Sequence, residues 1–255
     1  SWRLYILSNI RKNEIIKNLK DFENRGFKDK LNKIYRRLPK MECEGCGICC
    51  YDSPICTYAE FLYIFDYFNN DSNFNYGERL EIYKKAFREN IMGFISNEMP
   101  CAFLNQHNRC LIHERAPLSC KFWGTKTDEE YDRDLNMDHD RNKKYKEHYA
   151  KMGIDIPDEV INFTTPNCKN VKIVSNPYNL NGKDFDRIII DDLTKINRPY
   201  SNKNAPDWSI STYLLYYVFG EEVLKYRNKV IKEYQSGNAN AVEEYINKID
   251  FEKYI

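Results

Sequence analysis

Hydrophobic and aromatic residues recur every three or four positions over much of the chain, which is the spacing of a helix with one buried face. The clearest stripe lies within residues 78–97 and consists of Leu80, Tyr83, Phe87, Ile91, Phe94 and Ile95. We expect this stripe to face a protein core rather than a cofactor. The same spacing predicts further helices over residues 58–70, 183–195, 207–235 and 239–250.

The first 41 residues also show helical spacing but differ from the rest of the chain in charge. Their helical hydrophobic positions are Ile10, Ile15, Ile16 and Leu19, and a second helical piece covers residues 30–37. They hold twelve Lys and Arg against four Asp and Glu, a net charge of +8, whereas the remainder carries −7. One interpretation is a solvated helix packed on the core. The other is a docking arm for an acidic partner or for nucleic acid.

Strand signals are few and short. Residues 101–104 and 110–113 are strand-like runs on either side of the turn-rich segment 105–109, so we predict a hairpin there. Residues 171–174 form a weak strand, and the polar stretch 125–150 is an exposed helix or a mobile loop. The fold class that follows is mainly α (α+β): an irregular helical domain with cysteine-rich metal-binding loops and a small β-hairpin. We expect three parts: a basic N-terminal helical arm (1–41), a cysteine-cluster metal-binding domain (42–175) and a helical C-terminal region packed on it (176–255).

Composition excludes several classes of protein. Hydrophobic residues make up 42% of the 255 and charged residues 30%, which is enough for a sizeable core and argues against a disordered chain. The net charge of +1 does not indicate a globally basic nucleic-acid binder. The longest apolar stretch, near residues 212–219, is far shorter than the roughly 20 residues that span a bilayer. With no secretion signal visible either, we expect a cytoplasmic protein without a membrane segment.

The nine cysteines are the most informative residues in the chain. Clustered thiols in a reduced compartment point to metal or redox chemistry rather than to disulfides. Four of them fall within eight residues, as Cys43-x2-Cys46-x2-Cys49-Cys50. A Cys-x2-Cys loop lets two thiolates converge on one zinc ion, and iron–sulfur clusters use similarly short spacings. Gly45 and Gly47 let the loop turn back tightly.

Cys49 and Cys50 pose a separate question because they are adjacent. Adjacent side chains are expected to diverge, so both could serve one site only through an unusual turn. Two neighbouring sites, or one ligand and one free thiol, are the alternatives.

Four further cysteines follow: Cys101, Cys110 and Cys120 at short intervals, then Cys168. Together with the first four they make eight, which matches two four-coordinate sites or two [4Fe–4S] clusters, while one site with four spectators is equally compatible. The predicted metal ligands are Cys43, Cys46, Cys49, Cys50, Cys101, Cys110, Cys120 and Cys168. Nearby Arg109, Arg115 and Lys121 could offset the negative charge of such a site. The ninth, Cys56, is interpreted as a buried or spare thiol.

These motifs resemble a known family. The first cluster, followed by Cys101-Ala102-Phe103-Leu104 and by the segment from Cys110 to Cys120, is similar to the CxxCxxCC cysteine-cluster family, which is described as a zinc- or iron-chelating domain. The resemblance covers about residues 42–123 and extends toward Cys168. Three departures stand out: Ala102 replaces the usual Pro, His113 replaces the usual Tyr, and Ala116 is inserted before Pro117.

A more distant resemblance is to the flagellin lysine-N-methylases, through a similar cluster and the later stretch 163–168. It implies methyl transfer from S-adenosylmethionine to a lysine of a protein or peptide substrate. No glycine-rich nucleotide motif is present, so a donor pocket of the Rossmann type is not supported.

Two functional hypotheses follow from the residues and the resemblance. The first is a metal-binding protein whose cysteines hold zinc, iron, or one or two [4Fe–4S] clusters. The alternative is an iron–sulfur enzyme that binds S-adenosylmethionine and modifies a protein or peptide. The prediction of nucleic acid as a partner rests only on the basic residues 1–41. Sequence does not separate zinc from iron, because thiolates suit both metals.

Overall fold

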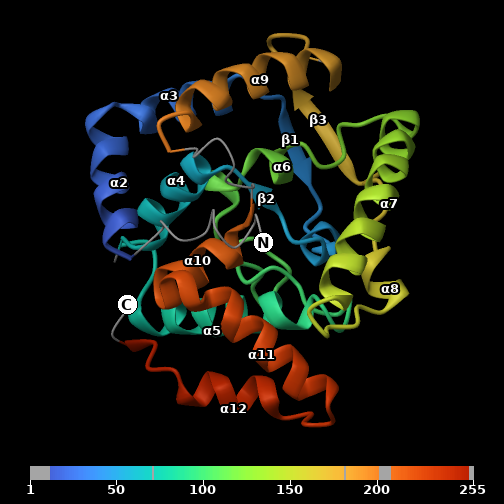
Figure 1. Ribbon diagram of the computed structural model, residues 1–255. Coiled ribbons are helices and arrows are strands. Elements are labelled where there is room, and N and C mark those ends of the chain that lie inside the picture. The colour runs from blue at the N-terminus through green and yellow to red at the C-terminus, as the bar shows by residue number, and fades with distance from the viewer. Residues whose placement is uncertain (1–11, 71, 181, 201–207, 253–255) are drawn as a thin grey trace.

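The computed structural model describes residues 12–70, 72–180, 182–200 and 208–252 (Figure 1). Within them the chain is mainly helical with two small two-stranded sheets, as the sequence predicts. The α-helices are α2 (Lys12–Asn24), α3 (Phe27–Arg36), α4 (Tyr58–Phe68), α5 (Tyr76–Met92), α6 (Leu118–Lys121), α7 (Asp128–Ala150), α8 (Asp158–Ile161), α9 (Gly182–Asn197), α10 (Ile210–Phe219), α11 (Val223–Gln235) and α12 (Ala241–Lys248). Short 3-10 helices are η2 (Ile48–Tyr51), η3 (His113–Arg115) and η4 (Gly220–Glu222). The strands are β1 (Lys40–Cys43), β2 (Ile55–Cys56), β3 (Val171–Ser175) and β4 (Trp208–Ser209).

The core is built on helices α4, α5 and α10, which pack against one another (Figure 1). Helix α4 is buried on nearly all sides, in keeping with its run of aromatic and aliphatic residues. It begins with a capping box, in which the Thr57 side chain and the Glu60 side chain each accept the other's backbone N–H. Phe61 of α4 stacks on Tyr213 of α10 with ring centroids 4.8 Å apart. The stripe predicted over 78–97 faces this core, and Tyr83, Phe87 and Ile91 are at most 1% exposed.

The N-terminal helices pack on the body of the protein. Ile15 on α2 and Leu31 on α3 are fully buried, while the basic side chains lie toward solvent. Helix α3 also runs beside α9, to which Arg37 is joined by an ion pair with Asp192 at 2.8 Å (Figure 1). The segment is therefore a helical pair packed on the core. Docking of an acidic partner on it stays a prediction, and Ile10 lies outside the described residues.

Both sheets are antiparallel pairs of strands distant in sequence. Strand β3, which confirms the weak strand predicted over 171–174, pairs with β1, and β2 pairs with β4. The hairpin predicted over residues 101–113 is reduced to a tight turn with one antiparallel bridge, between Leu104 and Cys110. Backbone bonds from Asn105 N to Arg109 O (2.9 Å) and from Leu111 N to Phe103 O (2.9 Å) hold that turn.

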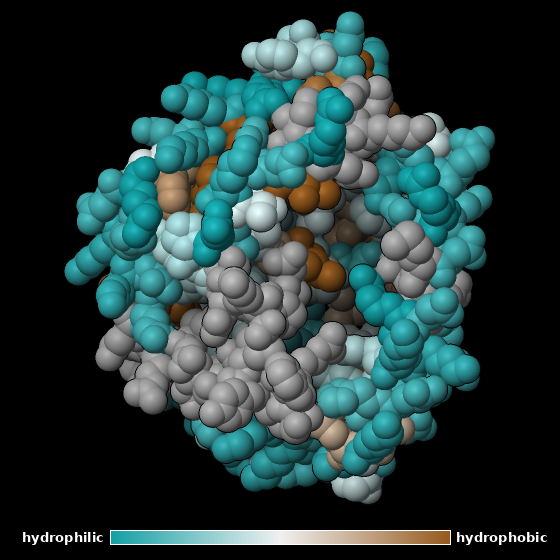
Figure 2. Space-filling model, turned by 45° about the horizontal axis from the view of Figure 1, so that its top comes forward, coloured by the Kyte–Doolittle hydropathy of each residue, from teal (hydrophilic) through white to brown (hydrophobic). Residues whose placement is uncertain are grey.

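The C-terminal half is helical but divided differently from the sequence prediction. The helix expected over 207–235 is two helices, α10 and α11, because Gly220 adopts φ 58° and the 3-10 turn η4 separates them. The polar stretch 125–150 is helix α7, which begins at the capping box of Thr127 and Glu130. None of the described helices combines the length and the apolar character that crossing a membrane requires. Figure 2 shows one face of the molecule, mostly hydrophilic with a few hydrophobic side chains in a recess.

Candidate metal centre

The first cysteine loop turns tightly because two glycines adopt left-handed backbone conformations. Gly45 has φ 71° and Gly47 has φ 75°, a region that residues with a side chain seldom occupy. Arg109 lies so close over Gly45 that a Cβ there would overlap its guanidinium group. The Gly45 N–H donates to the Cys43 sulfur at 3.3 Å. The two glycines therefore shape the loop as the Cys-x2-Cys pattern predicts.

Cys49 and Cys50 lie in the 3-10 turn η2, which directly follows Gly47. The Cys50 N–H donates to the Gly47 carbonyl at 3.0 Å and so closes the turn. The Cys50 thiol donates to the Cys49 sulfur, which lowers the pKa of Cys49 to about 7 and raises that of Cys50. The two thiols therefore lie near enough to affect each other's pKa, and whether both serve one metal site stays a prediction.

The second cysteine loop is joined to the first through the backbone. The Cys101 N–H donates to the Cys50 carbonyl at 2.7 Å, so the two segments run against each other. Cys101 is buried, at 7% exposed, and the bridge between Leu104 and Cys110 brings Cys110 back toward it. The tight turn is shorter than the predicted hairpin, yet it still folds the chain back so that Cys110 returns toward Cys101.

Cys120 reaches the same region from helix α6, which lies beside strand β2 (Figure 1). The neighbouring Ser119 hydroxyl donates to the Ile55 carbonyl at 2.8 Å and fixes α6 against that strand. Cys120 as a residue is exposed, so this edge of the site is open to solvent. Its thiol is nevertheless closely surrounded by protein atoms, which raises its pKa.

Five thiols form what we call the inner thiol group: Cys49, Cys50, Cys101, Cys110 and Cys120. Burial is the main cause of the raised pKa values of Cys101, Cys110 and Cys120, and the charges of neighbouring thiols in the group add to it. The charges of Cys101 and Cys110 likewise raise the pKa of Cys50, after the larger effect of its hydrogen bond to Cys49. The backbone contacts and the mutual effects of the thiols on their pKa values show that the five thiols lie in one neighbourhood, on three separate segments of the chain.

The three other predicted ligands lie outside this group. Cys43 and Cys46 are exposed, and Cys168 is half-buried. Cys43 ends strand β1 opposite Val171 of β3, three residues after Cys168. The ninth cysteine, Cys56, is buried on β2, as the interpretation of a buried thiol expects. Ligation by Cys43, Cys46 and Cys168 stays a prediction.

The side chains of the site are not arranged for coordination as they stand. Among the described residues, no three His, Cys, Asp or Glu side chains converge closely enough to hold a metal ion. Coordination therefore requires thiol side chains to rotate about their Cα–Cβ bonds and to lose their protons. The donor set itself fits zinc, iron or an iron–sulfur cluster, since thiolates are ligands for all three.

Two cations lie beside the cysteine loops, Arg109 over Gly45 and Lys121 near Cys110. The Lys121 ammonium donates to the His113 and Glu114 carbonyls at 3.3 and 3.2 Å, and its positive charge partly offsets the rise that burial causes in the pKa of Cys110. Arg115 lies over the Tyr63 ring at 4.4 Å and donates to Asn32, and its effect on the charge of the cysteines stays a prediction. Its guanidinium group therefore serves the packing of α3 on α4.

Two buried glutamates support the cysteine loops, and sequence reasoning missed both. Glu60 on α4 is 2% exposed and Glu89 on α5 is 6% exposed. Glu60 accepts the Leu118 N–H at 2.7 Å, and Glu89 accepts the Ala102 N–H at 2.7 Å. The capping pattern of Thr57 and Glu60 could have found the first, but nothing in the sequence distinguishes Glu89.

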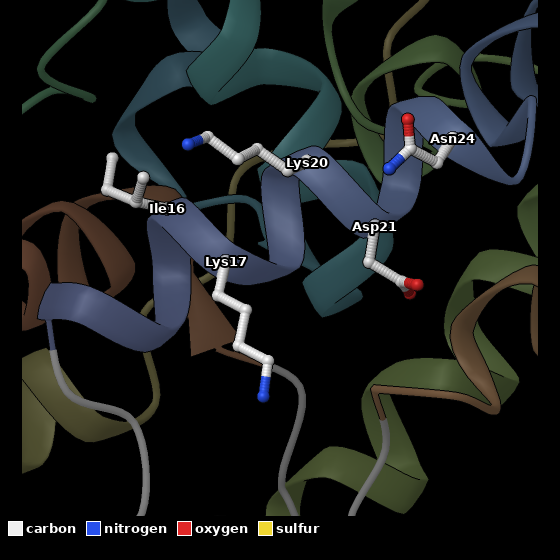
Figure 3. Close-up of a pocket in the computed structure, with 5 residues that line it drawn as sticks. All are labelled: Ile16, Lys17, Lys20, Asp21 and Asn24. Atoms are coloured by element: carbon white, nitrogen blue, oxygen red, sulfur yellow. The ribbon is translucent and has the colours of Figure 1, made fainter.

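A depression in the surface lies elsewhere. It has a volume of about 450 Å³ and runs along one side of α2, lined by Ile16, Lys17, Lys20, Asp21 and Asn24 (Figure 3). All five side chains come from one helix, and Asp21 pairs with Arg25 at 2.7 Å. We interpret it as solvated helix surface, separate from the thiols.

Thiols gathered on tight loops, with a positively charged neighbour and buried supports, define a metal-binding cysteine cluster. Residues 42–148 match the model of the CxxCxxCC family, described as "Putative zinc- or iron-chelating domain". The match covers less than half of the chain and confirms the resemblance seen in the sequence. Comparisons with curated proteins and with solved structures find no match.

Proposed function

We propose that the inner thiol group binds one zinc ion or one iron–sulfur cluster, and that this centre ties the cysteine loops to the helical body. What supports the proposal is that a backbone bond joins η2 to the 101–110 turn, and that the thiols of these segments and of α6 affect one another's pKa values. Four ligands complete a tetrahedral zinc site or anchor a [4Fe–4S] cluster, so the five thiols suffice without the outer ones.

The surroundings support a metal rather than a core role for these thiols. A core usually places isolated cysteines among apolar side chains, where they act as small hydrophobes. Here Cys49, Cys110 and Cys120 are half-buried or exposed, and Lys121 lies near Cys110 and Cys120. A bound metal would favour the thiolate forms and reverse the raised pKa values.

The first experiment is an anaerobic purification of the full chain, followed by analysis of metal and acid-labile sulfide and by an absorbance spectrum. Zinc without colour supports a zinc centre. Iron and sulfide with absorbance near ~400 nm support a cluster. A chain without zinc or iron, which also takes up neither from solution, contradicts the proposal.

Single substitutions then test which thiols bind. We expect Cys110→Ser and Cys120→Ser to lose most of the metal. The matched control is Cys56→Ala, because Cys56 is buried on β2 outside the inner thiol group. It should destabilise the chain and keep the metal. Cys43→Ser, Cys46→Ser and Cys168→Ser test whether the outer thiols hold a second centre, whose loss would lower the metal content without emptying the inner one.

The alternative activity, methyl transfer from S-adenosylmethionine to a protein or peptide lysine, stays a prediction from the resemblance in sequence. It is tested by calorimetric titration of the metal-loaded chain with S-adenosylmethionine. Heat of binding that disappears in Cys110→Ser would favour an enzyme, whereas no binding to the loaded chain would remove this alternative.

A further inference from the structure

Two buried carboxylates remain without a role in the proposed function. Glu60 and Glu89 lie on the two central helices, α4 and α5, and are almost fully enclosed. Burying a carboxylate costs free energy unless several hydrogen bonds satisfy it. Burial accordingly raises the pKa of each above its ordinary value. Both carboxylates accept hydrogen bonds on both oxygens, and in each case at least one donor belongs to a cysteine-bearing segment.

Glu89 holds the segment that contains Cys101. Its Oε2 atom accepts the N–H of Ala102, the residue after Cys101, and also the Ser211 hydroxyl from α10. Its Oε1 atom accepts the Ser53 hydroxyl, three residues after Cys50. One carboxylate on α5 is therefore bonded to Ser53 shortly after Cys50, to Ala102 directly after Cys101, and to α10.

Glu60 holds the segment that contains Cys120. Its Oε1 atom accepts the Leu118 N–H at 2.7 Å and the Tyr35 hydroxyl at 3.1 Å. Its Oε2 atom accepts the Thr57 N–H at 2.9 Å and the Thr57 hydroxyl at 3.0 Å, which caps α4. The first turn of α6, where Cys120 lies, is thus fastened to the first turn of α4.

We propose that Glu60 and Glu89 are positioning residues of the metal centre, which hold the backbone at Leu118 and Ala102 so that Cys120 and Cys101 stay within reach of one metal. This inference rests on the proposed function. Hydrogen bonds that orient ligands from outside the coordination sphere typically change metal affinity by about 10–100-fold. We expect a change of that size when either carboxylate is lost.

The two glutamates differ in a way that makes the proposal testable. Each Glu60 oxygen accepts a backbone N–H, and a glutamine amide group cannot accept on both sides. One Glu89 oxygen accepts only the Ser53 hydroxyl, which can rotate and accept a bond from an amide instead. Glu89→Gln should therefore keep the loop in place, whereas Glu60→Gln should not.

The experiment titrates the full metal-free chain with Co²⁺, whose absorption when bound by thiolates reports both affinity and ligand geometry. Thermal unfolding of each variant is measured in parallel. The structural control is Asn90→Ala, because Asn90 follows Glu89 on α5, is buried, and donates only to Thr212 on α10 at 2.7 Å. Asn90→Ala should lower the melting temperature and leave the Co²⁺ affinity within threefold of wild type.

Glu89→Ala and Glu60→Gln should weaken Co²⁺ binding by about 10–100-fold and alter its absorption spectrum, while Glu89→Gln stays within threefold of wild type. Should Glu89→Ala not fold, the contrast between the two glutamine variants decides. Wild-type affinity in Glu60→Gln, or equal weakening in Asn90→Ala, would overturn the inference. A wild-type chain that binds neither Co²⁺ nor zinc would instead overturn the proposed function.

Discussion

Replacing Gly45 with alanine tests whether the left-handed turn of the first cysteine loop sets the metal affinity. Gly45 has φ 71°, where a residue with a Cβ costs about 1–2 kcal/mol more than glycine. The new methyl group would also displace the Arg109 guanidinium, a small cost because it is the end of a flexible side chain. If the loop of the metal-free chain relaxes out of the left-handed conformation, metal binding must restore that conformation and bears its whole cost. The metal dissociation constant should then rise about 5–30-fold.

The assay is the same Co²⁺ titration, with chemical denaturation of the metal-free chain beside it. Gly26→Ala is the matched control, since Gly26 has a similar φ of 63° between α2 and α3 with open space around its Cα. It should cost about 1 kcal/mol of unfolding free energy and leave the Co²⁺ affinity unchanged. Gly45→Asn should be milder than Gly45→Ala, because asparagine tolerates this backbone region better.

A double substitution separates backbone strain from overlap. Adding Arg109→Ala to Gly45→Ala removes the contact and leaves the strain, so the recovered affinity measures the overlap alone. The reasoning fails if Gly45→Ala binds Co²⁺ within twofold of wild type, or if Gly26→Ala weakens binding as much.

Three further predictions concern the body of the protein. Removing the metal with a chelator should lower the melting temperature. A metal that binds the folded chain adds about 4 kcal/mol to the free energy of unfolding when its free concentration exceeds its dissociation constant 1,000-fold. Equal melting temperatures with and without the chelator would argue against a structural centre. Phe61→Ala should cost about 3–5 kcal/mol, measured by urea unfolding, because Phe61 is fully buried and stacked on Tyr213. Arg115→Ala should lose about 1–2 kcal/mol from its contact with Tyr63 and keep its metal, and metal loss there would mean that Arg115 does act on the thiols.

The helices and the metal-binding loops could be predicted from the sequence because both depend on local pattern. Periodic apolar residues located α4, α5 and α9, and cysteine spacing with glycines located the first loop. The backbone of the 101–113 segment was harder, since only the turn around Asn105 forms and the runs on either side do not pair further. The strand propensity of residues 101–104 and 110–113 did not reveal that the pairing would stop after one bridge.

Contacts between residues that are distant in the sequence could not be predicted from the sequence pattern. Arg115 is close to the cysteines in sequence, but its planar group finds the Tyr63 ring across the core. Glu89 looks like any glutamate on a helix, and only the fold brings Ala102 and Ser211 to it. The 3-10 turn that carries Cys49 and Cys50 begins after Gly47, whose positive φ the cysteine spacing does not reveal.

The pairing of β1 with β3 has a consequence for how the domain can be handled. Strand β3 begins at Val171, beyond residue 148 where the family match ends, and Tyr213, which covers Phe61, lies further on still. A fragment cut to residues 42–148 would expose a strand edge beside Cys43 and a bare aromatic face on α4. Unpaired strand edges and exposed apolar faces promote association between chains. We therefore expect the excised cysteine segment to aggregate, and chelation is best measured on a chain that retains the C-terminal helices.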